Sequence, residues 1–189
     1  MGDLLILASA SPRRSAILRQ IGVDFEIFPA NCDENLEGVA SQEEAPRRLA
    51  ECKAIDVSKR FPQRLVVGFD TLVFLDEQIL GKPVDEADAW RMLSALRGRW
   101  HQVRTGYCFA RSGEILIAGQ ETTEVCFRIF SQEELACYIA SGEPYDKAGG
   151  YGIQGLGARL VREIRGCFYN VVGLPVSATL EALERCQRM

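Results

Sequence analysis

The sequence predicts a mixed α/β fold, with an elongated sheet flanked by helices. In the first half of the chain, strand-like apolar runs alternate with helical segments, whereas strands cluster in the second half. Regular alternation is typical of a doubly wound parallel sheet, so the late cluster of strands indicates a sheet of mixed direction. The 189 residues are 47% hydrophobic and 25% charged, which suffices for a core in one domain or in two closely packed lobes.

Two strands and a helix are expected near the start of the chain. Residues 4–8 form a short apolar run, which predicts a buried strand. Ser11 is a good N-cap, Pro12 suits the first position of a helix, and Gly22 is typical of the residue after a helix. Residues 23–29 alternate between apolar and polar side chains, which predicts a second strand.

Two further helices flank the longest apolar run of the chain. We expect a helix over residues 42–60, and residues 65–75 are the most strand-like stretch of the sequence. Asp85 stands where an N-cap is needed for a helix over 86–97, and Gly98 follows as its end. The apolar side chains of this second helix recur on one face: Ala89, Met92, Leu93 and Leu96.

The second half of the chain is richer in strands. Residues 101–111 and 114–129 predict two long strands, and the capping-box sequence that begins at Ser131 predicts a short helix. A glycine-rich stretch over 142–157 follows. Two short strands and a last helix after Pro175 complete the expected elements.

Composition excludes several classes of protein. The chain has 22 basic and 26 acidic residues, a formal charge of −4, which argues against broad binding to nucleic acid or to an anionic membrane surface. No run approaches the roughly 18 apolar residues of a membrane-spanning helix, and the start lacks the cationic segment of a signal peptide. Seven cysteines without C-x-x-C spacing indicate thiols in a reducing compartment, so we expect a cytoplasmic protein.

Asp70 is the sharpest chemical signal in the sequence. It interrupts an apolar strand, where an unpaired carboxylate is costly, so such a residue is usually held by a metal, a cation or a catalytic task. The structural alternative is an aspartate that caps a neighbouring turn. Glu34, in a polar loop after Cys32, is a candidate second carboxylate for a divalent cation, or else it is a solvated loop residue.

A second candidate lies where the first strand meets the first helix. The free N–H groups of a helix start receive anions, and the hydroxyls of Ser9 and Ser11 add neutral donors. Arg13 and Arg14 would then clamp phosphate oxygens, since guanidinium groups bind phosphate bidentately. The alternative is a simple Ser11 cap followed by solvated arginines.

Further candidates carry cations or amides. Lys82 lies between Gly and Pro, where a rigid turn would hold a point charge for phosphate, and Lys53 on a helix is either a similar charge or a solvated side chain. The glycine-rich stretch 142–157 either builds an ordered binding loop or marks a flexible connector. Its spaced apolar residues favour the ordered loop. Gln154 within it has an amide suited to the edge of a base.

Taken together, these segments resemble the Maf family of nucleoside triphosphate pyrophosphatases. The motifs occur in family order over nearly the whole chain: LILASASPRR near the start, CDE at 32–34, ECKA at 51–54, VVGFDT at 66–71, GKP at 81–83, SGEPYDKAGGYGIQGLG at 141–157 and NVVGLP at 170–175. The resemblance implies one Maf-like domain over residues 1–189, with an ITPase-like fold whose nucleotide lies in a cleft between two lobes. It also implies hydrolysis of a nucleoside triphosphate to the monophosphate and pyrophosphate with Mg²⁺ or Mn²⁺.

The resemblance also assigns roles to residues. The family's catalytic acid, a proton acceptor, falls on Asp70, and the residues linked with substrate choice fall on Arg13, Thr71 and Gln154. The polar residues expected around the phosphates are Ser9, Arg14, Glu34, Lys53, Lys82 and Lys147. The SPRR and YGIQG motifs are similar to those of the dTTP/UTP pyrophosphatases, whereas the branch that favours 7-methyl-GTP has an aromatic residue in place of the first arginine.

Our hypothesis is that Asp70, with Glu34, holds the divalent metal and orients or deprotonates the attacking water. Basic side chains would clamp the phosphate oxygens: Arg13, Arg14, Lys53 and Lys82. The competing hypothesis is a non-catalytic nucleotide-binding regulator of cell division, which needs only the pocket. The expected partner is a nucleoside triphosphate, with neither nucleic acid nor membrane, and a homodimer is left open.

Overall fold

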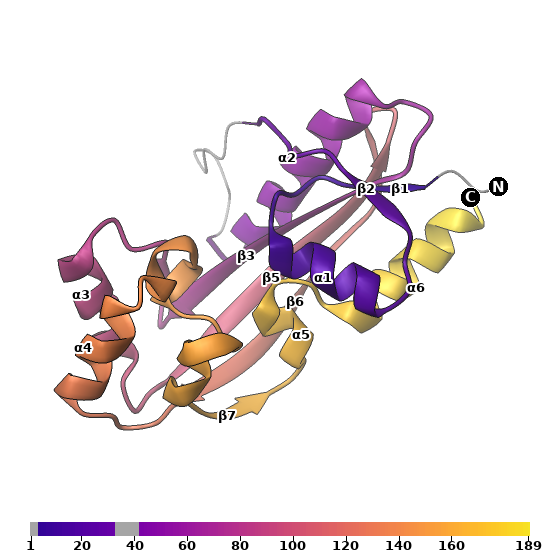
Figure 1. Ribbon diagram of the computed structural model, residues 1–189. Coiled ribbons are helices and arrows are strands. Elements are labelled where there is room, and N and C mark those ends of the chain that lie inside the picture. Colours follow the sequence, from indigo (N-terminus) through magenta and orange to yellow (C-terminus); the bar gives the residue numbers. More distant parts are fainter. Residues whose placement is uncertain (1–3, 33–41) are drawn as a thin grey trace. The chain divides into compact units, whose positions relative to one another are not determined.

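A computed structural model provides the structure of the chain and describes residues 4–32 and 42–189 (Figure 1). Within these residues, seven strands form one sheet in the order β2-β1-β3-β5-β6-β7, with β4 paired to β3. The strands are β1 (Leu5–Leu7), β2 (Phe25–Ile27), β3 (Val66–Leu75), β4 (Gln78–Leu80), β5 (Trp100–Arg111), β6 (Glu114–Phe127) and β7 (Val161–Arg165).

The sheet has mixed direction, and helices connect most of its strands. Strand β1 pairs in parallel with both β2 and β3, whereas β4 is antiparallel to β3 and β7 is antiparallel to β6. The α-helices are α1 (Pro12–Gln20), α2 (Ala45–Arg60), α3 (Glu86–Leu96), α4 (Gln132–Ala140), α5 (Phe168–Val172) and α6 (Val176–Gln187). The predicted mixed α/β class is therefore confirmed. No helix of the described residues has both the length and the apolar character of a membrane span.

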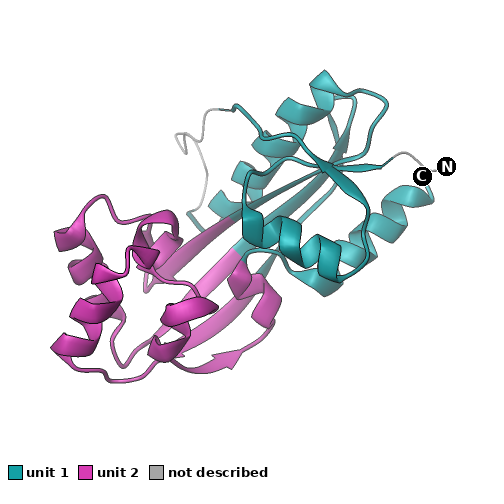
Figure 2. Cartoon of the chain, in the orientation of Figure 1, with its two compact units in different colours: residues 1–70, 105–121, 173–189 teal, residues 71–104, 122–172 magenta. Residues whose placement is uncertain are grey.

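The chain divides into two compact units (Figure 2). Unit 1 contains residues 1–70, 105–121 and 173–189, and unit 2 contains residues 71–104 and 122–172. The division falls inside β3, directly after Asp70.

Unit 1 is built around the parallel strands at the start of the sheet. The connection β1-α1-β2 leads to one side of β1, and the connection β2-α2-β3 leads back to the other side. Parallel crossovers are right-handed, so two crossovers that run in opposite directions along the sheet place their helices on opposite faces. Figure 1 shows α1 and α2 on opposite faces of the sheet in this way. Side chains of β1, α2 and β3 form part of the core, including Ile6, Val57 and Val66.

Helix α2 lies unusually close to the sheet. A Cβ on Gly68 of β3 would stand 2.5 Å from the carbonyl oxygen of Ala50 and 2.9 Å from the amide nitrogen of Ala54. A Cβ on Gly106 of β5 would overlap the backbone of Pro46 at the start of the same helix. The two glycines therefore allow the backbone of α2 to lie directly on the strands.

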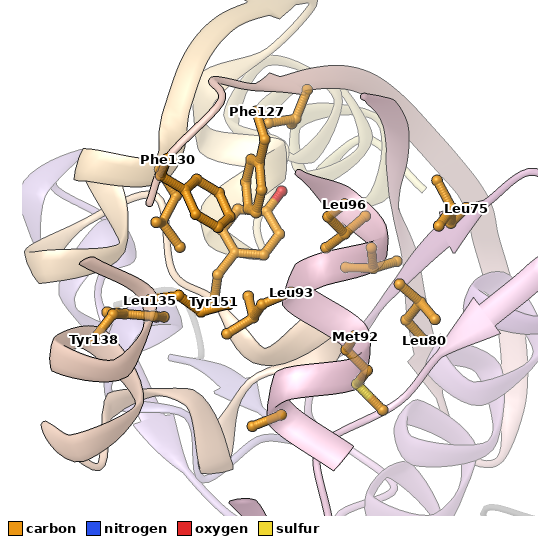
Figure 3. Close-up of a cluster of buried hydrophobic side chains, with 14 of the residues drawn as sticks. Leu75, Leu80, Met92, Leu93, Leu96, Phe127, Phe130, Leu135, Tyr138 and Tyr151 are labelled. Carbon is orange, nitrogen blue, oxygen red and sulfur yellow. The ribbon is translucent and has the colours of Figure 1, made fainter. Parts of the chain in front are cut away.

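Unit 2 has its own apolar core (Figure 3). Helix α3 contributes the predicted face, in which Ala89, Met92, Leu93 and Leu96 are all buried. Aromatic rings pack beside it, with the rings of Phe127 and Tyr151 in edge contact at 4.6 Å between centroids. The predicted caps are present too, because the Asp85 carboxylate accepts the Asp88 N–H at 2.8 Å and Ser131 forms a capping box with Glu134.

The second half of the chain contains an ordered glycine-rich loop and a helix where a strand was expected. The glycine-rich stretch is ordered and forms three 3₁₀ turns, η2 (Glu143–Asp146), η3 (Ala148–Gly150) and η4 (Gly155–Leu160). The prediction of two short strands after it is wrong for the second, which is the helix α5. Tertiary contacts hold this segment, since the buried Asn170 side chain donates to the Val103 carbonyl and to the Thr123 hydroxyl at 3.0 Å each.

Candidate active site

Asp70 and Lys53 form an ion pair within unit 1. Asp70 lies in β3 with 8% of its surface exposed, and its Oδ1 stands 2.5 Å from Nζ of Lys53 on α2. The Lys53 side chain is only 14% exposed. Lys53 can reach Asp70 because the Gly68 contact brings α2 onto β3 two residues before the carboxylate. The carboxylate that interrupts the apolar strand is thus held by a cation, one of the expected ways to bury it.

A second group of polar residues follows strand β1. The guanidinium of Arg14 donates from Nη1 to the Ser9 hydroxyl oxygen at 3.0 Å and from Nε to the Gly173 carbonyl at 2.9 Å. Its Cζ lies 6.0 Å from the ring centroid of Phe69, the residue before Asp70. Arg14 therefore points back from the first turn of α1 toward the end of β1 and the middle of β3. Arg13 is half-buried beside it.

The strand order explains why these residues come together. Leu7 of β1 pairs with Val67 of β3. Ser9 lies two residues after Leu7, and Phe69 lies two residues after Val67. The crossover from β1 to β2 and the crossover from β2 to β3 run in opposite directions along the sheet, which makes the carboxyl end of β1 a topological switch point. Ligands of open α/β sheets bind in the crevice outside the carboxyl ends of strands at such a point. The residues that follow the carboxyl end of β1, Ser9 and Arg14 among them, are therefore the candidate ligand site of unit 1, and Asp70 lies three residues after the paired Val67.

Ser11 begins the helix without capping it through its side chain. It occupies the predicted N-cap position before Pro12, but its hydroxyl makes no cap hydrogen bond. Its N–H instead donates to the Ser9 hydroxyl oxygen at 3.2 Å. The simple alternative of a Ser11 side-chain cap is therefore wrong.

The other predicted site residues belong to unit 2. Thr71 directly follows Asp70 in β3 and is half-buried, whereas Lys82 is exposed in the turn after β4. Gln154 is exposed directly before η4. Lys147 is mostly buried, and its Nζ lies 2.7 Å from the carbonyl oxygen of Glu143 and 2.5 Å from Oδ1 of Asp146.

Unit 2 brings two of these segments side by side. The Gly149 N–H donates to the Gly81 carbonyl at 2.9 Å, and a Cβ on Gly150 would lie 3.1 Å from the ring of Pro83. The turn that carries Lys82 therefore packs against the turn that follows Lys147. Both predicted phosphate-binding lysines of unit 2 lie on this pair of turns.

The predicted metal ligands are only partly within the described residues. Glu34 lies outside them, so Asp70 is the predicted carboxylate ligand that the described residues include. Over residues 4–32 and 42–189, no group of three or more His, Cys, Asp or Glu side chains is placed to hold a metal ion. Mg²⁺ is commonly bound by one or two carboxylates together with substrate phosphates. The Asp70 carboxylate fits that mode.

His101 and the cysteines have structural surroundings. Burial lowers the pKa of His101 to about 4, and its Nε2 lies 2.7 Å from the Tyr151 hydroxyl, so its surroundings favour a structural rather than a basic role. All seven cysteines are outside disulfides. Burial raises the pKa of Cys108 to about 12, so this thiol stays protonated at neutral pH.

Sequence reasoning missed two features of the site. Lys53 and Asp70 were expected separately, as a phosphate ligand and a catalytic acid, and their pairing follows from the close approach at Gly68. Glu143 was not singled out at all, although its carboxylate accepts two backbone N–H groups of the loop that follows Gln154. A glutamate directly after a turn glycine gives no signal of its own in the sequence.

Comparisons with known proteins agree with these motifs. The "dTTP/UTP pyrophosphatase" of Symbiobacterium thermophilum is 48% identical over 181 residues, which cover 96% of this chain and 93% of that protein. The "dTTP/UTP pyrophosphatase" of Thermococcus gammatolerans is 49% identical over 173 residues, 92% of this chain and 91% of that protein. Among solved structures, the Staphylococcus aureus Ham1 protein matches with a TM-score of 0.47 and 15% identity, over 84% of this chain and 80% of that one. The sequence model of the family described as "Maf-like protein" matches residues 4–186, and this chain belongs to that family.

Proposed function

We propose that this protein hydrolyses nucleoside triphosphates to the monophosphate and pyrophosphate, with dTTP and UTP as its preferred substrates. The observation that carries the proposal is the buried Asp70 carboxylate, paired with Lys53 and three residues beyond the pairing of β1 with β3 at the switch point. The relatives named dTTP/UTP pyrophosphatase, at 48% and 49% identity over more than nine-tenths of the chain, support the reaction and the substrates.

Asp70 is suited to direct the attacking water. Hydrolysis adds water to one phosphorus atom and releases pyrophosphate, so the protein must orient a water, accept its proton and offset charge on the phosphates. A carboxylate held in a strand by Lys53 has a fixed direction, which favours the acceptance of a proton from one defined position. We assign to Asp70 the role of proton acceptor and to Lys53 that of its holder and of a phosphate ligand.

The remaining predicted cations would offset the charge of the triphosphate. In unit 1, Arg13 and Arg14 stand in the first turn of α1, where the backbone N–H groups also favour an anion. The ligand's charge outweighs the unfavourable effect of a cation at a helix start, which is about 0.3–1 kcal/mol. In unit 2, Lys82 and Lys147 lie on two adjoining turns. We assign phosphate contacts to these residues and to Ser9.

A divalent cation completes the proposal. Asp70 and Glu34 would hold Mg²⁺ or Mn²⁺ together with phosphate oxygens of the substrate. Such an ion, when bound, neutralises phosphate charge and lowers the pKa of a coordinated water. Substrate choice would rest on Arg13, Thr71 and Gln154, with the Gln154 amide reading the edge of the base. Seven thiols outside disulfides fit a reducing compartment, so we place the protein in the cytoplasm.

The test is a pyrophosphate assay with a panel of nucleotides. Purified protein is incubated with dTTP, UTP, CTP, dGTP or 7-methyl-GTP and Mn²⁺, and pyrophosphate and nucleoside monophosphate are quantified. We expect equimolar pyrophosphate and monophosphate, most rapid turnover with dTTP and UTP, and loss of turnover with a chelator. Binding of dTTP without turnover would instead identify a nucleotide-binding regulator, and preference for 7-methyl-GTP would contradict the assigned substrates.

A further inference from the structure

We infer that Glu143 is a positioning residue for Gln154, because its carboxylate fixes the backbone on which Gln154 is presented to the base. The inference rests on the proposed function, in which Gln154 reads the nucleotide. It adds a residue that would determine specificity without touching the substrate.

The Glu143 carboxylate is fully engaged with the loop after Gln154. Its Oε2 accepts the Leu156 N–H at 2.9 Å, and its Oε1 accepts the Gly157 N–H at 3.0 Å. The hydroxyl of Tyr138, at 3.5 Å, faces Oε1 as well. Hydrogen bonds to an ionised acceptor are roughly twice as strong as bonds between neutral groups. Two consecutive amides are thus tied to one carboxylate.

The loop closes tightly around this carboxylate. Gly155 has a φ of +68°, and a Cβ there would lie 3.0 Å from Oε2 of Glu143. A Cβ on Gly157 would overlap the carbonyl of Gly152 and stand 2.9 Å from the Tyr138 hydroxyl. The glycines on either side of Leu156 are therefore what allows the carboxylate to reach both amides. This explains the spacing of glycines after Gln154.

Glu143 also connects this loop to Lys147. It is the first residue of η2, and its N–H donates to the Ser141 hydroxyl at 3.2 Å, which fixes it to the end of α4. Its carbonyl accepts a hydrogen bond from the Lys147 ammonium at 2.7 Å. The Lys147 stem in turn covers Gly152, whose Cβ would stand 2.8 Å from Cε. One residue therefore anchors both the loop of Gln154 and a predicted phosphate ligand.

The position of Gln154 follows from these anchors. Gln154 itself is exposed and extended, so its amide direction depends on the backbone that carries it. The anchored amides lie only two and three residues further along. A loop held in its binding geometry before the ligand arrives avoids the entropy of ordering on binding. Loss of Glu143 would leave the amides of Leu156 and Gly157 without this acceptor and give Gln154 several orientations.

The experiment compares Glu143→Ala and Glu143→Gln with wild type over the nucleotide panel. We expect KM for dTTP and UTP to rise by about tenfold in the alanine variant, as expected for two lost hydrogen bonds, while kcat changes by less than about threefold. The preference for dTTP over dGTP should fall by a similar factor. Glu143→Gln keeps the length and one acceptor oxygen, so its values should lie between those of wild type and the alanine variant.

The matched controls are Glu163→Ala and Glu163→Gln. Glu163 is an exposed glutamate of β7 in the same unit, and its side chain contacts Arg162 and Arg165. Its substitutions remove the same charge without touching the loop. They should leave KM, kcat and the base preference at wild-type values.

A double-mutant cycle with Gln154→Ala separates positioning from a general loss of order. If Glu143 acts through Gln154, the double variant should discriminate between bases no worse than Gln154→Ala alone. Additive losses of discrimination in the two variants would overturn the inference. So would an unchanged base preference in an active Glu143→Ala variant, an outcome that leaves the proposed function intact.

Amide hydrogen exchange gives a readout that does not depend on turnover. Exchange at Leu156 and Gly157 should accelerate by at least about tenfold in Glu143→Ala and stay unchanged in Glu163→Ala. Unchanged exchange in Glu143→Ala overturns the inference whether or not the protein is an enzyme. Absence of pyrophosphate release by the wild type, together with the expected change in exchange, would count against the proposed function alone.

Discussion

The pair of Lys53 and Asp70 is the residue-scale feature on which the chemistry depends. Both side chains are largely buried, at 14% and 11% side-chain exposure. Replacing such a pair by apolar residues of similar size is often neutral or stabilising, because desolvation offsets much of the attraction between the charges. Stability alone therefore gives little reason for an ion pair here. A directed carboxylate near the carboxyl end of β1 gives a chemical reason.

The substitution Asp70→Asn tests this role. It keeps the size of the side chain but removes the proton acceptor, so we expect kcat for dTTP to fall by about 10²–10⁴-fold. Nucleotide binding should persist, because the phosphate ligands are unchanged. Single-turnover kinetics and calorimetric titration with dTTP measure the two quantities. Circular dichroism and urea unfolding check that the variant is folded, and a folded variant with a near-wild-type rate would remove Asp70 from the mechanism.

At the scale of elements, the contact between α2 and β3 sets the geometry of the site. Gly68 lies between Ala50 and Ala54 of the helix, and this approach brings Lys53, in the same turn of the helix, to the level of Asp70. A second glycine, Gly106 of β5, lies against the start of the same helix. At two points, a glycine therefore lets the backbone of the helix lie directly on the sheet.

The substitution Gly68→Ala tests this contact. The added Cβ would stand 2.5 Å from the Ala50 carbonyl, so the helix must move away from the strand. We expect a loss of roughly 1–3 kcal/mol in the free energy of unfolding, the usual cost of overpacking a close contact. Turnover should fall as well, since Lys53 moves with its helix. Urea unfolding and steady-state kinetics measure both effects.

Gly81→Ala is the stability control for this prediction. A Cβ at Gly81 meets nothing within 4 Å, and its φ is not in the left-handed region. Its free energy of unfolding should stay within about 0.5 kcal/mol of wild type, as for other open sites. A wild-type stability for Gly68→Ala would mean that α2 is not held against β3 as described.

Elements with strong local signals could be predicted from the sequence. The face of α3, the capping box of α4 and the helix start at Pro12 depend on neighbouring residues, and all three are confirmed. The segment 168–172 depends instead on tertiary contacts of Asn170, and the prediction of a second short strand before the last helix is wrong. Individual site residues were predictable through chemistry and family resemblance. The Lys53–Asp70 pair was not, because it requires the packing of α2 on β3.

At the scale of the whole molecule, each compact unit is assembled from separate stretches of chain. Unit 1 uses three stretches and unit 2 uses two, and β3, β5 and β6 contribute residues to both. No single cut in the sequence releases either unit. The predicted site residues are divided in the same way, with Ser9, Arg14 and Lys53 in unit 1 and Lys82 and Gln154 in unit 2.

Stability of the folded chain also depends on its one histidine. His101 is 3% exposed in the core of unit 2, and its ring makes edge contacts with Phe127 and Tyr151 at 5.0 and 5.4 Å between centroids. Burial disfavours the charged imidazolium and lowers the pKa of His101 to about 4 from 6.5. Between these two values, the unfolded chain binds a proton that the folded chain does not.

The free energy of unfolding should therefore decrease as the pH falls from about 6.5 toward about 4, because acid favours the unfolded state through this histidine. Linkage gives a loss of about 1.4 kcal/mol at this site between about pH 8 and about pH 5.5. His101→Gln keeps a hydrogen-bonding side chain near Tyr151 but does not titrate. Between these two pH values, the free energy of unfolding of the variant should therefore fall by about 1.4 kcal/mol less than that of wild type. Urea unfolding of both proteins at the two pH values measures the difference. Equal pH dependence in the two proteins would show that His101 is protonated as readily in the folded chain as in the unfolded one, contrary to its burial among aromatic rings.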